Sequence, residues 1–241
     1  MLSGIYHAAA GMRVREHYLD LTASNLANAA APGYRRDVPR FEVNPMPPAQ
    51  TAGAQPASIP YELVVRTAVD LRTGPVQSTG DPLDLALDGP GFFAVQSPNG
   101  VLYTRAGNFT RDASGQLVTQ DGYPVLTDSG PVQISGSRVQ VDEAGNISVD
   151  GTVVGKLVIA SFSPAVQMTK VGSGLLQASE VPDTSGAGTR VLQGYLEMSN
   201  VNLISEMVGL IRAQRAYEAG QKVIQSLDDV LARASSDVGR A

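Results

Sequence analysis

Residues 203–231 read LISEMVGLIRAQRAYEAGQKVIQSLDDVL, and this stretch decides the fold. Apolar side chains return at every seventh position of it, at Leu203, Leu210, Tyr217, Ile224 and Leu231. A seven-residue repeat places these side chains along one face of a long helix. Other apolar residues flank this seam, so the apolar stripe is wider than a single partner helix covers. The stretch therefore predicts a long C-terminal helix that requires more than one neighbour.

The other end of the chain carries a second heptad seam, broken only by Glu16. Its members are Leu2, Ile5, Ala9, Met12, Leu19, Ala23 and Leu26. This spacing predicts one helix of about 25 residues. Two interpretations of the paired ends stay open on these patterns alone. The helices form a hairpin that caps a β domain, or they are loosely ordered in the monomer and pack against other copies on assembly.

The middle of the chain has the pattern of short strands. Apolar runs lie on either side of Gly89-Pro90-Gly91, a strong turn signal. Residues 111–117 and 141–147 form a weak internal repeat in which Asp opens a turn and Gly closes it, so each copy predicts a β-hairpin. Residues 153–162 predict a further strand. We therefore expect an α+β protein, with a central, mainly antiparallel β domain flanked by long N- and C-terminal α-helices that pair in a coiled-coil-like core.

Composition divides the chain into segments of different character. We expect an N-terminal assembly helix in 1–31, a turn and extended Pro-rich linker region in 32–80, a β-rich outer domain in 81–193 and a C-terminal assembly helix in 194–241. Residues 44–60 of the linker contain five prolines and no charged residue. Residues 61–197 hold fourteen acidic and eight basic residues, so the acidity of the chain belongs to its middle.

The composition excludes several classes of function. The chain has no cysteine, which removes disulfides, iron–sulfur clusters and thiol nucleophiles, and its two histidines, His7 and His17, stand too far apart on one helix to share a metal. A net charge of −5 argues against a nucleic-acid partner. No apolar run is long enough to span a membrane, and the N-terminus lacks the pattern of a secretory signal peptide. Motifs of hydrolases and nucleotide-binding proteins are missing. We therefore expect no catalysis, no cofactor, no metal site and no membrane insertion.

Several motifs resemble those of the bacterial flagellar rod and hook proteins. The N-terminal helix runs into Asn25-Leu26-Ala27-Asn28 and then into Pro32-Gly33-Tyr34-Arg35-Arg36, the order in which that family places a helix end, a Pro-Gly-aromatic turn and basic residues. Further matching segments are 84–93, 103–109, 194–202 and 214–218. The resemblance extends over residues 1 to 234.

The resemblance implies a non-enzymatic building block. It implies a subunit of the basal-body rod that assembles through its terminal helices into a helical axial tube, transmits motor torque and leaves the cytoplasm unfolded through the flagellar export apparatus, without a cleaved signal peptide. Its partners would be copies of itself, other rod subunits above and below, and the periplasmic ring bushing. The length of the chain and its short stretch after the first helix favour the proximal over the distal rod subunit. The alternative from a different class is a secreted adhesin-like binding module, which has no reason to carry both terminal signatures.

The resemblance also implies which residues contact neighbouring subunits. Pro32 and Gly33 should end the first helix, so that Arg35 and Arg36 face acidic groups or helix C-termini of a neighbour; the alternative is a solvated basic turn. Asn25 and Asn28 would bridge to adjacent chains or cap their own helix. Arg215 and Glu218 would form a pair between subunits or within the helix. The expected subunit-interface residues are Leu2, Ile5, Met12, Leu19, Asn25, Leu26, Asn28, Pro32, Gly33, Tyr34, Arg35, Glu197, Ser199, Asn200, Val201, Leu203, Met207, Leu210, Gln214, Arg215, Tyr217, Glu218, Ile224 and Leu231.

Overall fold

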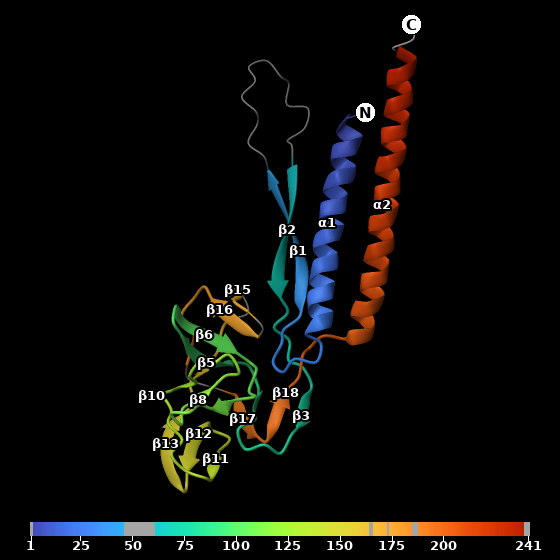
Figure 1. The fold of residues 1–241 in the computed structure, drawn as a ribbon. Helices are drawn as coiled ribbons and strands as arrows, with labels where there is room; N and C mark the ends of the chain where they lie inside the picture. The colour runs from blue at the N-terminus through green and yellow to red at the C-terminus, as the bar shows by residue number, and fades with distance from the viewer. Residues whose placement is uncertain (1, 46–60, 164–165, 173, 185–187, 239–241) are drawn as a thin grey trace, which may run out of the picture. The chain divides into compact units, whose positions relative to one another are not determined.

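A computed structural model describes residues 2–45, 61–163, 166–172, 174–184 and 188–238 (Figure 1). Within these ranges the side chains of residues 2–9, 43–45, 61–63, 227, 228, 231 and 234–238 are not described. The chain divides into two compact units. The helical unit contains Met1–Leu26, Asp37–Ala68 and Asn202–Ala241, and the β unit contains Ala27–Arg36 and Val69–Val201. Each unit is therefore assembled from segments that lie far apart in the sequence.

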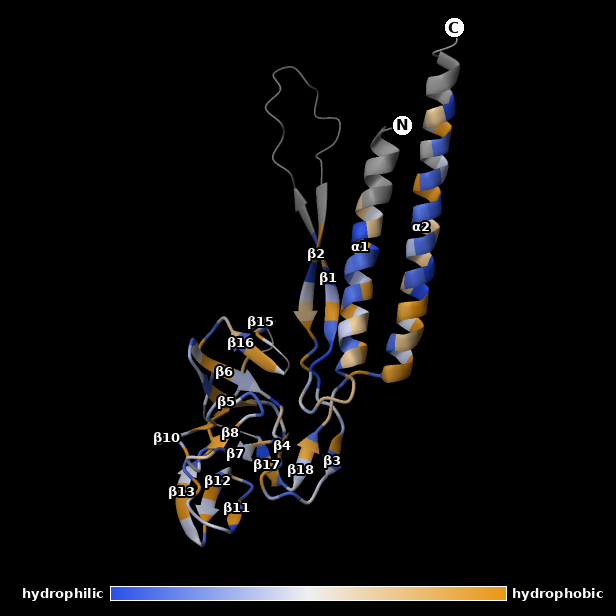
Figure 2. Ribbon diagram, in the orientation of Figure 1, coloured by the Kyte–Doolittle hydropathy of each residue, from blue (hydrophilic) through white to orange (hydrophobic). Residues whose placement is uncertain are grey.

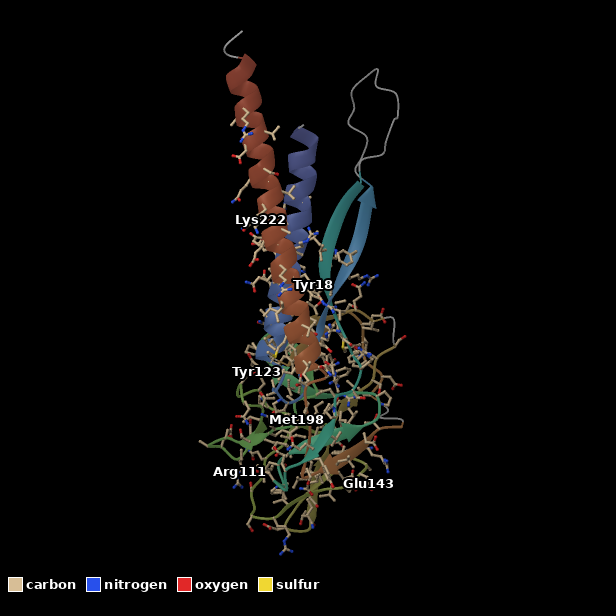
Figure 3. All side chains as sticks on the ribbon, turned by 90° about the vertical axis from the view of Figure 1, so that its right-hand side faces the viewer. Tyr18, Arg111, Tyr123, Glu143, Met198 and Lys222 are labelled. Atoms are coloured by element: carbon tan, nitrogen blue, oxygen red, sulfur yellow. The ribbon has the colours of Figure 1, made fainter. Side chains whose placement is uncertain are left out.

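Two long helices confirm the expected α+β class. Helix α1 spans Leu2–Ala27 and helix α2 spans Leu203–Val238. They lie side by side and run in opposite directions (Figures 1 and 3). Glycines allow the close approach: a Cβ on Gly209 would lie 3.5 Å from Tyr18 Oη, and one on Gly220 would lie 3.0 Å from Met12 Cγ. The helices pack together, and their pairing as a coiled coil stays a prediction.

The region expected to be an extended linker contains paired strands. Strand β1 (Asp37–Pro45) pairs with β2 (Tyr61–Val69) in a two-stranded ribbon of the helical unit. Asn25 of α1 fixes the first residue of β1, because its Nδ2 donates to Asp37 O and its Oδ1 accepts from Asp37 N, both at 2.8 Å. An asparagine side chain here takes the place of a strand partner. Residues 46–60, which hold most of the Pro-rich stretch, lie outside the described residues.

The β unit is built from short strands whose pairings are antiparallel. Its largest sheet has the order β14 (Ile159–Ala160), β5 (Phe92–Ser97), β6 (Gly100–Thr104), β16 (Leu175–Ala178) and β15 (Met168–Lys170). A second sheet contains β11 (Val139–Val141), β12 (Asn146–Val149) and β13 (Thr152–Lys156). The remaining pairs are β3 (Val76–Ser78) with β18 (Tyr195–Glu197), β4 (Leu85–Asp88) with β17 (Arg190–Gln193), β7 (Thr110–Arg111) with β8 (Leu117–Val118), and β9 (Leu126–Thr127) with β10 (Gly130–Pro131). The single strand expected over 153–162 is wrong, since β13 and β14 divide it between two sheets.

The internal repeat is confirmed as two turns with the same hydrogen bonds. Asp112 Oδ1 accepts from the backbone N–H of Ser114 and Gln116, and Asp142 Oδ1 accepts from that of Ala144 and Asn146. Each turn joins two paired strands, as expected. A third turn, at 119–123, has the same backbone hydrogen bonds with Thr119 in place of Asp. The sequence repeat did not predict this turn. Arg111, Tyr123 and Glu143 lie at these three turns (Figure 3).

Apolar side chains of both large sheets fill the interior of the β unit. Phe93, Val95 and Ile147 are fully buried there, and the Phe93 and Phe109 rings meet edge to face at 5.2 Å between centroids. In the part of the chain that is described, neither helix has a stretch long and apolar enough to cross a membrane.

Candidate functional site: a buried ionic junction and an exposed helix face

The two signature segments of the chain meet inside the β unit. Gly33 N donates to Glu197 O at 2.7 Å, and Arg36 N donates to Asn200 Oδ1 at 2.7 Å. The Asn200 amide also donates to the carbonyl oxygens of Asp70 and Arg72, at 3.0 and 2.8 Å. The turn after α1 and the segment before α2 are therefore one hydrogen-bonded structure.

Gly33 is required where these segments meet. Its φ is +66°, and a Cβ there would lie 2.0 Å from Ala106 N. Only glycine allows both this conformation and this approach of two backbones. The expectation that Pro32 and Gly33 end the helix needs correction, because α1 already ends at Ala27 and Gly33 reverses the chain after a turn.

A single carboxylate joins three segments of the β unit. Glu197 Oε1 accepts from Arg35 Nη2 at 2.7 Å and from Gly74 N at 2.8 Å, and Glu197 Oε2 accepts from Arg105 Nη1 at 2.9 Å. The exposed fractions of the three side chains are 1% for Arg35, 3% for Arg105 and 1% for Glu197. We call Arg35, Arg105 and Glu197 the ionic junction. Charges this deeply buried remain in a folded protein only when they are paired.

Arg105 has the largest set of partners in the ionic junction. It donates to Leu87 O at 3.2 Å and to Gly89 O at 2.6 Å, and its Cζ lies 5.2 Å from the centroid of the Phe92 ring. Burial lowers the pKa of Arg105, and the charge of Glu197 opposes that shift. Two guanidinium groups share one carboxylate, so the ionic junction carries surplus positive charge.

The structure corrects the expected roles of several signature residues. Arg35 faces an acidic group of its own chain and not of a neighbour, and the Tyr34 ring is buried beneath Lys170, whose Nζ lies 3.7 Å from the ring centroid. Asn25 is buried against Asp37. These side chains hold the chain's own segments together.

Sequence reasoning assigned no role to Arg105 or to Gly74. Arg105 lies in a segment that matches the family, 103–109, and this membership was the available signal. Nothing in the sequence pointed to Gly74, because its part is played by a backbone N–H and by its lack of a side chain: a Cβ would lie 2.0 Å from Met198 O.

The first turns of α2 present an apolar face to solvent. Its members are Leu203, Ile204, Met207, Val208 and Ile211, all of them exposed, and we call them the α2 face. Ile204 is 74% exposed. The acidic residue within 203–211, Glu206, is buried, so the α2 face presents no charge of its own (Figure 2). An apolar, uncharged centre with polar residues around it is typical of a protein interface.

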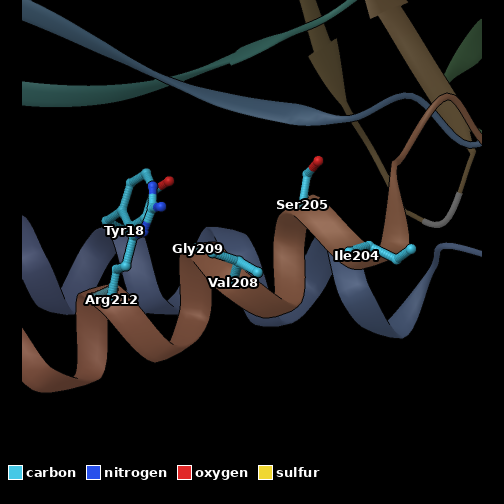
Figure 4. A pocket seen from close by; sticks show the side chains of 7 residues that line it. Tyr18, Ile204, Ser205, Val208, Gly209 and Arg212 are labelled. Carbon is cyan, nitrogen blue, oxygen red and sulfur yellow. The ribbon is translucent and has the colours of Figure 1, made fainter.

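A groove lies beside the α2 face within the helical unit (Figure 4). It measures about 590 Å³ and is lined by Tyr18 of α1 and by α2 residues that include Ile204, Gly209 and Arg212. The missing side chain of Gly209 opens the groove next to Tyr18. The helix pair therefore offers both exposed apolar side chains and a hollow next to them.

The remaining interface candidates fall into distinct groups. The exposed ones are Leu203, Met207, Gln214, Arg215 and Glu218, and the half-buried ones are Met12, Leu19, Leu26, Asn28, Pro32, Asn200, Val201, Leu210, Tyr217 and Ile224. Gly33, Tyr34, Arg35, Asn25, Glu197 and Ser199 are buried. Glu218 accepts from Gln214 Nε2 at 3.3 Å, four residues earlier on the same helix. The side chains of Leu2, Ile5 and Leu231 lie outside the described part of the chain.

The segments after α1 and before α2 are joined inside the β unit, and the helix pair presents an apolar face, features that suit a structural protein. Two family models match the chain: "Flagellar basal body rod FlgEFG protein C-terminal" over residues 192–237 and "Flagellar hook protein FlgE/F/G D1 domain" over residues 86–154. The first of these regions contains Glu197 and the α2 face.

Curated relatives match over nearly the whole chain. Flagellar basal-body rod protein FlgG of Bacillus subtilis (strain 168) is 33% identical over 261 residues, covering 96% of this chain and 97% of that protein. FlgG of Agrobacterium fabrum is 33% identical over 257 residues, with the same coverage. Flagellar basal-body rod protein FlgF of Rhizobium meliloti (strain 1021) is 31% identical over 245 residues, covering 99% of each chain. The chain belongs to the flagellar basal-body rod protein family. It is a structural subunit of the flagellar basal body and not an enzyme, which sets aside the adhesin-like alternative.

Proposed function

We propose that this chain builds the rod by packing its α2 face against other copies of itself and against the rod subunits above and below it. The observation that carries the proposal is the group of exposed apolar side chains within 203–211, where the one acidic residue is buried. Covering each such side chain contributes on the order of 1 kcal/mol. The α2 face is thus a source of association energy that the helix pair leaves unused within the described chain.

The neighbour of the α2 face should itself be apolar. The described solvent-exposed residues of α1 include Arg13, Arg15, Glu16 and Asp20, which are charged. Charged side chains lose hydration when they are packed against apolar ones. We therefore expect the α2 face to contact the α2 helix of another copy, in addition to the coiled-coil-like pairing of N- and C-terminal helices that the heptad seams predict.

We further propose the proximal position in the rod, as a subunit of the FlgF type. The alignment with FlgF of Rhizobium meliloti runs over 245 residues, close to the 241 of this chain, whereas the alignments with two FlgG relatives run over 257 and 261 residues. Sequence identity does not separate the two types, because all three values lie between 31 and 33%. The argument therefore rests on length.

Two further partners belong to this proposal. Passage through the flagellar export apparatus requires an unfolded chain, and a chain without cysteine forms no disulfide that would obstruct it. The acidic β unit, which faces outward in the expected rod, would contact the periplasmic ring bushing.

The test substitutes two apolar side chains of the α2 face and follows rod assembly in cells. A strain lacking the gene is complemented with the parent chain, with an Ile204→Asp and Met207→Asp double variant, or with Gln225→Asp, which adds a charge at an exposed polar position of the same helix. Basal bodies are then purified and imaged. We expect complete rods with the parent and with Gln225→Asp, and truncated rods with the double variant. Complete rods with the double variant would exclude the α2 face as the assembly contact, and the length of the stub in the deletion strain reports the proximal or distal position.

A further inference from the structure

One apolar side chain of the β unit stands almost entirely in solvent. Val181 is 93% exposed, the largest value among the large hydrophobic residues of the described chain. Glu180 beside it is exposed and forms no ion pair within the described residues. The loop is anchored, since Asp183 N donates to Ser161 O at 2.9 Å and Ser161 N donates to Asp183 O at 2.7 Å. One exposed valine is ordinary by itself, and it becomes informative only if the chain offers a matching surface.

The β unit contains such a surface in a cavity of about 830 Å³. Part of its wall is apolar, from Leu71, Val76, Phe92 and Phe162, and part is cationic, from Arg72 and Arg105. Its volume lies within the roughly 300–1,000 Å³ of ordinary ligand sites, and the mixture of apolar walls with a few charged groups is typical of them. We call it the Arg105 cavity.

The charges around the Arg105 cavity favour an anionic group. Glu197 lines the cavity together with Arg105, and it is the one carboxylate that Arg35 and Arg105 share. Arg105 Nε is buried and has no hydrogen-bond partner in the described part of the chain, so Arg105 acts on the cavity through its charge. The other charged groups that line the cavity are already paired: Arg72 with Asp70, and Asp88 with Arg190. The uncompensated charge is therefore positive, and its field extends into a cavity with apolar walls.

We infer that the Arg105 cavity receives the segment Glu180-Val181-Pro182 of a second copy of this chain. Val181 packs between Leu71, Phe92 and Phe162, and Glu180 points toward Arg72 and Arg105. The acidic and apolar groups of the segment match the two kinds of wall in the cavity. The inference rests on the proposed assembly of copies and adds a contact between β units to the contact between helices. The segment and the cavity are neighbours within one chain, because Asp183 pairs with Ser161 and the next two residues, Phe162 and Ser163, line the cavity.

The natural absence of cysteine allows a direct test. Val181→Cys is prepared in one sample and Val76→Cys in another, because Val76 lines the cavity and is exposed. The two full-length chains, one with a size tag, are mixed and oxidised with copper phenanthroline, which accepts the two electrons as two thiols lose their protons and form one disulfide. A disulfide between chains of different size can arise only between copies. The control partner is Val153→Cys, which is exposed on β13 and does not line the Arg105 cavity.

We expect the Val181→Cys and Val76→Cys pair to cross-link roughly tenfold faster than the control pair, because a docked segment raises the effective concentration of the two thiols. Equal rates for the two pairs would overturn the inference. A second measurement uses sedimentation: Glu180→Lys weakens self-association by roughly tenfold, and combining it with Arg72→Glu restores part of the loss. Failure of the parent chain to self-associate would overturn the proposed assembly as well. Self-association with equal cross-linking rates would overturn only the contact at the Arg105 cavity.

Discussion

Charged side chains usually lie at the surface of a protein and apolar ones in its interior. The ionic junction of the β unit and the α2 face of the helical unit depart from this rule in opposite directions. The first buries three charged side chains, and the second exposes five apolar ones. The buried charges are paired within the chain, through Glu197 and backbone carbonyls, with one guanidinium in excess of the single carboxylate. The exposed apolar groups have no such compensation in the described helix pair. The comparison teaches that the buried charges of the β unit find partners in their own chain, whereas the α2 face finds no cover within the described helix pair.

The strongest test of this pairing within the β unit is the removal of the shared carboxylate. Glu197→Ala leaves Arg35 and Arg105 buried without a counter-charge, and we expect the free energy of unfolding to fall by about 3–5 kcal/mol. Urea unfolding and hydrogen exchange in β5 and β6 measure the loss.

The matched control for that variant is an exposed ion pair. Asp88→Ala removes the partner of Arg190, where both side chains are at least half exposed, so the expected loss is below ~1 kcal/mol. Similar losses in the two variants would show that the ionic junction is no more important than a surface pair.

The next largest effect is expected at a close approach of two backbones beside the ionic junction. Gly33→Ala places a Cβ 2.0 Å from Ala106 N at a positive φ, and we expect a loss of about 2–4 kcal/mol. Gly80→Ala is the control, because Gly80 has a similar φ of +76° with nothing within 4 Å of the added Cβ. Its expected loss is about 1 kcal/mol, from the backbone conformation alone. Equal losses would mean that the two backbones are free to move apart.

A smaller effect is expected at Asn25, whose side chain pairs with backbone groups inside the helical unit. Asn25→Ala leaves the backbone N–H and C=O of Asp37 without the amide that pairs with them, and we expect a loss of about 1–3 kcal/mol in the stability of the helical unit. Faster hydrogen exchange at the start of β1 would locate the change. Glu16→Ala, an exposed substitution on the same helix, should leave that exchange unaltered. If the two variants exchange alike, Asn25 is not an anchor of β1.

Some of this architecture was readable from the sequence because it is local. The heptad spacing predicted both helices, and the positions of Asp112 and Asp142 before glycines predicted two turns that the structure reproduces. The third turn was not predicted because Thr119 stands in place of Asp, with its hydroxyl accepting one backbone hydrogen bond, from Tyr123 N. The β1–β2 ribbon was not predicted because proline and missing charge were the dominant signals around it.

The ionic junction could not be predicted because its pairing depends on three-dimensional contact. Arg35 and Glu197 stand 162 positions apart, and a basic residue after a turn has the same local sequence whether it meets solvent, a neighbour or its own chain. The motifs identified the family, but assigned Arg35 to the wrong partner. Exposure of the α2 face was partly predictable, because the apolar stripe is wider than one partner helix covers.

The turns of the β unit predict a modest acid sensitivity. Hydrogen bonds from the Asn146 side chain and backbone lower the pKa of Asp142, and a hydrogen bond from Ser114 followed by backbone N–H groups lowers the pKa of Asp112. The stabilisation is therefore complete above the unfolded value near 3.9 and is lost as the pH falls through the lower pKa of the folded state. We expect an Asp112→Asn and Asp142→Asn double variant to lose less Tm than the parent between pH 6 and pH 3. At pH 7, where an amide oxygen still accepts the turn hydrogen bonds, the two chains should differ by only a few degrees. Parallel Tm curves from pH 6 to pH 3 would contradict the assignment.

The smallest effect on the stability of the isolated chain is expected at Ile204, the most exposed apolar residue of the α2 face. This variant tests most directly how the α2 face differs from the ionic junction. Ile204→Ser changes an apolar side chain that is 74% exposed, so the free energy of unfolding should stay within about 0.5 kcal/mol of the parent value. Leu85→Ala in the β unit, at a side chain that is 1% exposed, should cost about 2–5 kcal/mol. Self-association measured by sedimentation should show the reverse order, because Ile204→Ser weakens it by roughly tenfold while folded Leu85→Ala keeps the α2 face unchanged. A residue that is neutral for folding and important for association belongs to a surface kept for a partner. If Ile204→Ser changed neither the free energy of unfolding nor self-association, the apolar composition of the α2 face would have no role in assembly. The ionic junction and the α2 face would then differ in burial alone.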